Sequence, residues 1–119
     1  MKSYWGRVGA LLGAAAVCTG AFGAHGLKAK AEAGKLDPKF LKAWETAAHY
    51  HLLHAILLTA TADTGSLSDR SALLFLSGIA LFSGSLYAMT LTQNRAFGPI
   101  TPIGGLTLIA GWLSLAGIF

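Results

Sequence analysis

The sequence predicts an all-α protein: a four-helix transmembrane bundle with a short interfacial amphipathic helix before the second span. Hydrophobic residues make up 54% of the 119-residue chain and charged residues only 12%, about half the charged share of an ordinary soluble domain. Asp, Glu, Lys and Arg are absent from four stretches, 8–27, 46–62, 71–94 and 96–119. Because about 20 apolar residues cross a bilayer as a helix, the pattern predicts a single integral membrane domain over residues 1–119.

The first span is expected over about residues 5–26 and carries a stripe of small residues at spacings of three and four: Gly6, Gly9, Gly13, Ala16, Gly20 and Gly23. This spacing keeps every member on one face of a helix. Helices in lipid associate through close backbone approach rather than through a hydrophobic force. The stripe should therefore pack against a neighbouring helix, with Gly13 and Gly20 at the contacts.

A lysine-rich segment over 28–35 separates this span from the interfacial helix, expected over about 38–45. Asp37 suits the N-cap and Pro38 the first helical position. Two aromatic residues, Phe40 and Trp44, share one face, and the other face carries Lys39, Lys42 and Glu45. Such a helix lies at the headgroup level, with Trp44 as an anchor, and runs into a second span over about 44–62.

The third and fourth spans are expected over about 71–92 and 98–118. Pro99 and Pro102 predict an irregular entry to the fourth span, after which small residues repeat at helical spacing: Gly104, Thr107, Gly111 and Ser114. Spans one and four both carry small-residue stripes, so they are expected to make the closest contacts. Gly84 in the third span is a further candidate packing position.

Basic residues are divided unequally between the two ends of such a bundle. Three lie at the end that holds the N-terminus, Lys2, Arg7 and Arg70, and six lie at the other, Lys28, Lys30, Lys35, Lys39, Lys42 and Arg95. The positive-inside rule places the lysine-rich loop in the cytoplasm or the mitochondrial matrix. The net charge of +4 is interpreted as attraction to lipid headgroups, not to nucleic acid.

Histidines concentrate in the second span, in the run "HYHLLH". His51 and His54 share a helical face with Trp44 and Leu58, whereas the leucines lie mostly opposite, so this face should point into the bundle. Alternating span directions bring five polar residues into one half of the membrane: His25, His51, His54, Tyr87 and Thr101. The pattern predicts a polar intramembrane cluster, with His54 neutral and close to Tyr87 or Thr101.

Four hypotheses compete for this cluster. It is a hydrogen-bond network that fixes helix packing, a path for protons or a solute, a transition-metal site, or a pair of axial haem ligands. A zinc site needs three or four ligands, and no carboxylate is expected at this depth. His51 and His54 share one helix, which makes them a poor axial pair. The sequence therefore predicts no metal site and no cofactor.

No catalytic residues are predicted. The sequence contains no recognisable Ser/His/Asp arrangement, phosphate-binding loop or carboxylate pair, so an enzyme is not expected. The single cysteine, Cys18, is expected to be a small packing residue.

Four segments resemble a known family when they are taken in order: "GAFGAHGL" at 20–27, "WETAAHYHLLHA" at 44–55, "LFSGSLY" at 81–87 and "ITPIGG" at 100–105. Together they are similar to the bacterial and mitochondrial proteins called domain of unknown function 423, or transmembrane protein 256 homologues. The resemblance covers nearly the whole chain. It implies a small four-span membrane protein and no established activity. The family motifs fall on His25, Tyr50, His54, Ser83, Gly84, Ser85, Tyr87, Thr101, Pro102, Gly104 and Gly105.

The sequence thus favours a non-enzymatic protein of the bacterial plasma membrane or the mitochondrial inner membrane. It would act through helix packing, as a homo-oligomer or as an accessory subunit of a membrane complex such as a respiratory one. Its partners would be the lipid bilayer and other membrane subunits. A small transporter or channel that uses the polar cluster is the first alternative. A haem- or metal-binding membrane protein is the second.

Overall fold

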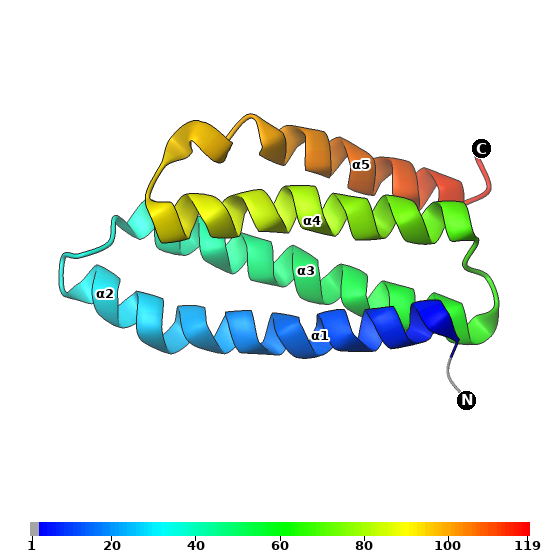
Figure 1. The fold of residues 1–119 in the computed structure, drawn as a ribbon, viewed down its shortest axis with the longest axis horizontal. Coiled ribbons are helices and arrows are strands. Elements are labelled where there is room, and N and C mark those ends of the chain that lie inside the picture. The colour runs from blue at the N-terminus through cyan, green and yellow to red at the C-terminus, as the bar shows by residue number, and fades with distance from the viewer. Residues whose placement is uncertain (1–2) are drawn as a thin grey trace.

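The computed structural model describes residues 3–119, which form long antiparallel helices joined by short turns (Figure 1). Met1 and Lys2 lie outside the described residues. Lys2 is one of the basic residues counted above for the membrane orientation. In chain order the elements are α1 (Tyr4–Phe22), a π-helical turn (Gly23–Leu27), α2 (Lys28–Glu32), α3 (Pro38–Thr64), α4 (Asp69–Thr92), a 3-10 turn (Arg95–Phe97) and α5 (Ile100–Leu115). Residues 3–119 contain no strand, which confirms the all-α class.

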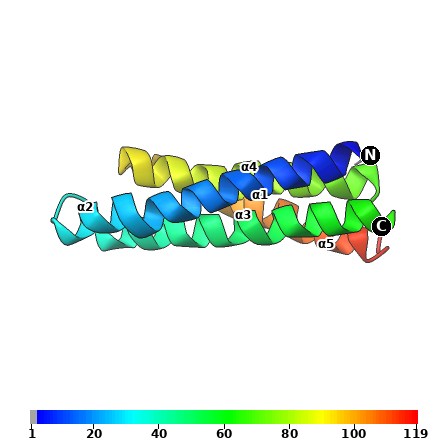
Figure 2. The same cartoon turned by 90° about the horizontal axis from the view of Figure 1, so that it is seen from below.

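The bundle is flat, with principal extents of 47 × 30 × 16 Å. Figure 1 shows α1, α3, α4 and α5 in that order across its broad face. Figure 2 shows α4 toward one side of the slab and α3 and α5 toward the other, with α1 slanting from the α4 side at its start toward α3 at its end. α1 packs along α3, α3 along α4, and α4 along α5. The two helices with small-residue stripes, α1 and α5, are therefore the outer pair. They pack closely against α3 and α4, respectively, and not along one another.

Three helical segments are long and apolar enough to cross a membrane: Tyr4–Glu32, Asp69–Thr92 and Arg95–Leu115. With 27 residues, α3 is about 40 Å long, also sufficient, but it is less apolar because it carries charged residues near both ends and three histidines between them. It lies between α1 and α4 and runs alongside both (Figure 1). The four long helices thus form the all-helical bundle that the sequence predicted, and three of its four expected spans meet both criteria for crossing a membrane.

The first helical rod extends farther than expected. It does not end near Gly26 but continues through the π-helical turn and α2 to Glu32. Its end lies at Gly34, whose φ of +75° favours glycine. There the Lys35 amide donates to the Lys30 carbonyl at 2.9 Å and the Gly34 amide to the Ala31 carbonyl at 3.1 Å. These paired bonds satisfy carbonyl groups at the end of the helix. Gly26 lies inside the helix and does not end it.

The expected interfacial helix is not a separate element. Asp37 caps α3, its carboxylate accepting a hydrogen bond from the Lys39 amide at 3.0 Å, and Pro38 occupies the first turn. The helix then runs to Thr64 without a break, because the sequence from 39 to 64 contains neither glycine nor proline. The region around 38–45 is therefore the first two turns of α3, continuous with the second span.

Two apolar clusters lie inside the bundle. The larger one joins α3, α4 and α5 through Leu58, Ala72, Phe75, Ile79 and Leu108, all buried. The smaller one closes the lysine-rich end and is made of Leu27, Leu36, Phe40 and Trp44. The polar residues described below lie between and beside these two clusters.

Close backbone contact occurs at some glycines of the stripes. A Cβ atom on Gly9 would lie 2.8 Å from the backbone nitrogen of Thr59, and one on Gly104 would lie 2.7 Å from the carbonyl carbon of Leu81. Rings cover two others: Trp44 lies over Gly23, and Phe75 lies over Gly111. Gly13 makes only an ordinary contact, its Cβ position being 3.9 Å from the Cβ of Ala55.

Gly20 and Gly84 lack the close contact expected of them. A Cβ added at either would meet no atom of the described chain within 4 Å. At Gly20 the reason is the Trp44 ring, which inserts between the two helices at Gly23, one turn farther along the chain. It holds α3 away from α1 at this level.

Candidate functional site: the polar cluster inside the bundle

His51 and His54 lie one turn apart on the inward face of α3. Their side chains are 6% and 4% exposed. Leu52, Leu53 and Ile56 on the opposite face are exposed, as expected for residues that contact lipid. The helical face assigned from the sequence is thus the face that the structure buries.

Both ring nitrogens of His54 are paired. Nδ1 lies 2.7 Å from the Tyr50 carbonyl oxygen, and Nε2 accepts from the indole N–H of Trp112 at 3.1 Å. A carbonyl only accepts and an indole N–H only donates, so the imidazole carries its proton on Nδ1 and is neutral. The hydrogen bond from Trp112 also links α3 to α5.

The partners of His54 differ from those expected. Tyr87 and Thr101 were the candidates, but Thr101 instead bonds to Ser85, at 2.6 Å between the hydroxyl oxygens. The reason is depth. α5 runs antiparallel to α4, and Thr101 lies near its start, so the residue level with His54 is farther along the helix. Trp112 was missed, although an indole N–H in an apolar span needs an acceptor, which was the available signal.

His51 belongs to a chain of hydrogen bonds across three helices. Its Nδ1 lies 2.9 Å from the Tyr87 hydroxyl, which lies 2.9 Å from the Thr19 hydroxyl. Thr19 donates to the Ala16 carbonyl at 3.0 Å. Each of the two contacts of Tyr87 joins groups that can either donate or accept. The chain of hydrogen bonds connects α3, through α4, to α1.

This chain does not use the second ring nitrogen of His51. Nε2 is buried and has no hydrogen-bond partner among the described residues. A buried polar atom without a partner is uncommon in native proteins. Of the two histidines, only His54 therefore has both ring nitrogens hydrogen-bonded.

His25 does not join the cluster. The helix continues through it as part of the π-helical turn, and the side chain is exposed. On a continuous helix His25 lies away from the glycine stripe that faces α3. The expectation that His25 stands at the mouth of the cluster is therefore not met.

Trp44 connects the cluster to the π-helical turn. Its indole N–H donates to the Thr19 carbonyl at 2.7 Å. Its ring lies 4.5 Å from the Tyr87 ring and 5.5 Å from the Phe22 ring, measured between centroids. Single π-helical turns within α-helices are rare and often occur at functional sites. The sequence placed Trp44 at the headgroup level but gave no sign of its contact with Thr19.

Other polar side chains also join helices in pairs. Hydroxyls of α4 donate to carbonyls of α3: Ser83 to Ala47 at 2.8 Å and Thr90 to Phe40 at 2.9 Å. Three further pairs are Ser71 with Ser114, Ser85 with Thr101, and Trp5 with Asp69. The buried polar groups of this bundle are therefore mostly used between helices. In residues 3–119 no three His, Cys, Asp or Glu side chains come together as a metal-binding group.

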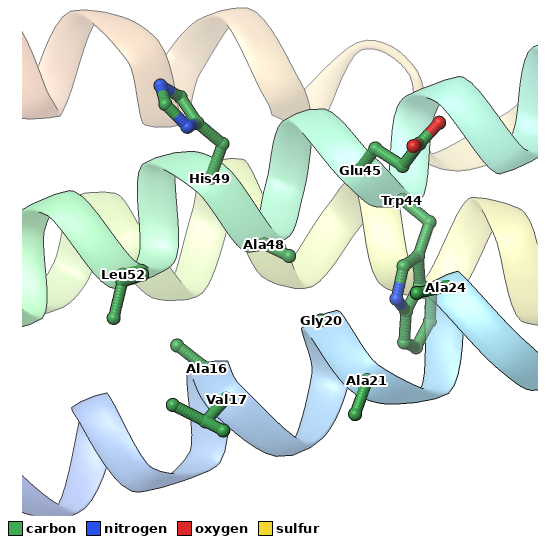
Figure 3. A pocket seen from close by; sticks show the side chains of 10 residues that line it. All are labelled: Ala16, Val17, Gly20, Ala21, Ala24, Trp44, Glu45, Ala48, His49 and Leu52. Atoms are coloured by element: carbon green, nitrogen blue, oxygen red, sulfur yellow. The ribbon is translucent and has the colours of Figure 1, made fainter.

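An open apolar groove of about 500 Å³ runs between α1 and α3 at the level of Gly20 (Figure 3). Ala16, Val17, Ala21 and Ala24 line it from one helix and Ala48 and Leu52 from the other. Figure 3 shows the Trp44 ring between the helices at one end, with Glu45 and His49 on the outer side of α3. The groove lies beyond the close contact between Gly9 and Thr59, at a level where α1 and α3 are farther apart.

Comparison with known proteins gives consistent matches. The family model described as protein of unknown function, DUF423, matches residues 19–105. A UPF0382 membrane protein of Staphylococcus haemolyticus is 49% identical over 113 residues, covering 91% of this chain and 88% of the relative. YwdK of Bacillus subtilis, another UPF0382 membrane protein, is 42% identical over 117 residues, covering 92% and 88%. A UPF0382 membrane protein of Schizosaccharomyces pombe is 36% identical over 116 residues, covering 92% and 95%. No solved structure gives a significant match.

Proposed function

Because this chain belongs to the DUF423 family, whose relatives are UPF0382 membrane proteins, we propose that it is a non-enzymatic membrane protein that acts by assembling with other helices. It forms a homo-oligomer or serves as an accessory subunit of a larger membrane complex, such as a respiratory one. Its location is a bacterial plasma membrane or a mitochondrial inner membrane.

The observation that carries this proposal is the outward face of α1. Ala10, Ala14 and Cys18 recur every four residues, and all three are exposed. Small residues at this spacing let a second helix approach closely in lipid. The glycine stripe of α1 already serves contacts within the chain, such as Gly9 with Thr59. The outward stripe is a second packing surface on the same helix.

The interior supports a structural role. His54, Thr101, Ser83 and Thr90 are each hydrogen-bonded to another helix. Polar side chains used in this way hold a bundle in one arrangement. We propose that these hydrogen bonds hold the helices in the arrangement that exposes the outward stripe of α1, Ala10, Ala14 and Cys18.

Cys18, the single cysteine of the chain, provides a direct test. Mild oxidation of native membranes should link two copies through Cys18 if the outward face of α1 forms a symmetric dimer, and Cys18→Ala should abolish the link. The control is Ile56→Cys in the Cys18→Ala background, because Ile56 is exposed on α3. A Cys18 adduct with a different membrane subunit, identified by mass spectrometry, supports the accessory role. Only uncrosslinked monomer, purified without partners, contradicts both forms of the proposal.

A second candidate, proton or solute passage through the cluster, is favoured by one observation, the unpaired Nε2 of His51. It predicts proton flux into proteoliposomes that His51→Leu abolishes while the fold survives. His54→Leu, which removes a satisfied residue, is the matched control. Equal flux through wild type, both variants and empty liposomes would rule out this candidate.

A further inference from the structure

We propose that the groove between α1 and α3 binds one acyl chain of a phospholipid whose zwitterionic primary-amine headgroup is held by Lys42 and Glu45. The probe of this chemistry is phosphatidylethanolamine. The inference goes beyond helix assembly, because it assigns a ligand to a surface that the outward stripe of α1 does not use.

The groove has the shape and chemistry of an acyl-chain site. Its volume is about 500 Å³ and its lining is mostly alanine, glycine, valine and leucine. Gly20 lies in its floor with open space above it, since no described atom lies within 4 Å of its Cβ position. The Trp44 ring bounds the groove toward the lysine-rich end of the bundle (Figure 3). An open apolar groove between two helices accommodates a hydrocarbon chain without any polar partner.

A polar depression adjoins the groove at the membrane surface. It has a volume of about 320 Å³ and is lined by Lys42, Glu45, Thr46, His49 and Tyr50, of which Glu45 and His49 also line the groove. Glu45 follows Pro38 by seven residues, about 10 Å along α3. It is adjacent to Trp44, an aromatic residue of the kind that marks the interface. The depression is therefore at headgroup depth and adjoins the edge of the apolar groove, with which it shares Glu45 and His49.

The charges in this depression complement a zwitterion. Lys42 and Glu45 are exposed, and neither side chain forms an ion pair or hydrogen bond with the described residues. They are three residues apart on α3 and so lie on one face. A headgroup phosphate accepts charge-assisted hydrogen bonds from the Lys42 ammonium, and a headgroup ammonium donates them to the Glu45 carboxylate.

This arrangement discriminates among lipids. A trimethylammonium headgroup has no N–H to donate to Glu45. An anionic glycerol headgroup gains Lys42 but places negative charge close to the carboxylate. A second copy of the chain packed on this face would bury the charges of Glu45 and Lys42 in the protein interface unless it brought opposite charges to both. The zwitterionic primary amine satisfies the two charges together.

Native mass spectrometry of the full chain, released from nanodiscs of mixed headgroups, tests the proposal. Wild type should retain phosphatidylethanolamine with about tenfold preference over phosphatidylcholine and phosphatidylglycerol, equivalent to about 1.4 kcal/mol. Glu45→Gln should abolish the headgroup preference. Gly20→Leu, which fills the groove, should remove bound lipid of every kind. Glu32→Gln and Gly84→Leu are the matched controls, since Glu32 is an exposed carboxylate of α2 and Gly84 also has open space around it.

Three results would overturn the proposal: equal retention of phosphatidylethanolamine and phosphatidylcholine, a preference for phosphatidylglycerol, or loss of lipid in Glu32→Gln equal to that in Glu45→Gln. A dimer that Gly20→Leu dissociates would show that a second copy occupies the groove and would also overturn it. Thermal unfolding of each variant, with a midpoint unchanged from wild type, establishes that the fold is intact. Crosslinking at Cys18 reports on helix assembly separately, so the two proposals fail independently.

Discussion

The contact between α1 and α3 differs at its two ends. At the Gly9 end the backbones meet so closely that a Cβ atom would lie 2.8 Å from the Thr59 nitrogen. At the Gly20 end the helices are held by the Trp44 indole, which donates to the Thr19 carbonyl at 2.7 Å, and an open groove separates them. Both glycines belong to one stripe of the same helix. The spacing of small residues therefore indicates which face packs, but not which members make contact.

The strongest test compares the two glycines directly. Gly9→Leu should destabilise the bundle by about 3 kcal/mol or more, because the side chain has no space beside the α3 backbone. Gly20→Leu should change stability by less than about 1 kcal/mol, because the space above Gly20 is open. Equilibrium unfolding by SDS, followed by circular dichroism, measures both. Equal destabilisation would show that the two ends are packed alike.

A second test compares the satisfied and the unsatisfied histidine. His54→Leu should cost about 1–2 kcal/mol, because it leaves the Trp112 indole N–H without an acceptor. His51→Leu should lower the free energy of unfolding by less than about 1 kcal/mol, because the substitution also removes a buried nitrogen, Nε2, that has no hydrogen-bond partner. His54→Lys, which buries a charge, should be worse than either. The same unfolding measurement ranks the three variants, and a larger cost at His51 than at His54 would refute the assigned pairing.

A third test separates hydrogen bonding from packing at the Gly20 end. Trp44→Phe keeps an aromatic ring but removes the donor to the Thr19 carbonyl, so it should cost about 1 kcal/mol. Trp5→Phe is the matched control, because the hydrogen bond from Trp5 to Asp69 is exposed. Unfolding of both variants under identical detergent conditions gives the comparison. No difference between Trp44→Phe and Trp5→Phe would mean that ring packing alone holds this end.

The smallest expected effect is a pH dependence at the start of α3. The hydrogen bond from the Lys39 amide lowers the pKa of the Asp37 carboxyl below its ordinary value of 3.8. A lowered folded-state pKa contributes stability above the unfolded-state pKa that is lost as the pH falls through the folded-state value. Wild type should therefore lose a small part of its stability in this acidic range. Asp37→Asn, which caps without titrating, should lose less, and parallel acid titrations of the two proteins would contradict the assignment.

Periodicity was sufficient for several features of the site. The inward face of α3 followed from the positions of His51 and His54 relative to the leucines, because helical geometry fixes which residues share a face. The cap of α3 followed from Asp37 and Pro38, whose local chemistry favours a helix start. The hydrogen-bond partners of His54 and Trp44 could not be predicted from this periodicity. Trp112 and Thr19 come from other helices, and their depth relative to α3 depends on where each helix begins and ends.

The sequence by itself determined that this chain is a membrane-embedded helical bundle, because charge-free stretches of about 20 residues have a low free energy only as helices in lipid. It also determined the stripes through which α1 and α5 pack. Only the tertiary structure decided that these are the outer helices, that the first rod continues past His25, and that Trp44 separates α1 from α3 at Gly20. The physical reason is that faces are set by spacing within one helix. Neighbours, depth and open space are set by the fit of side chains between helices, and no single helix encodes that fit.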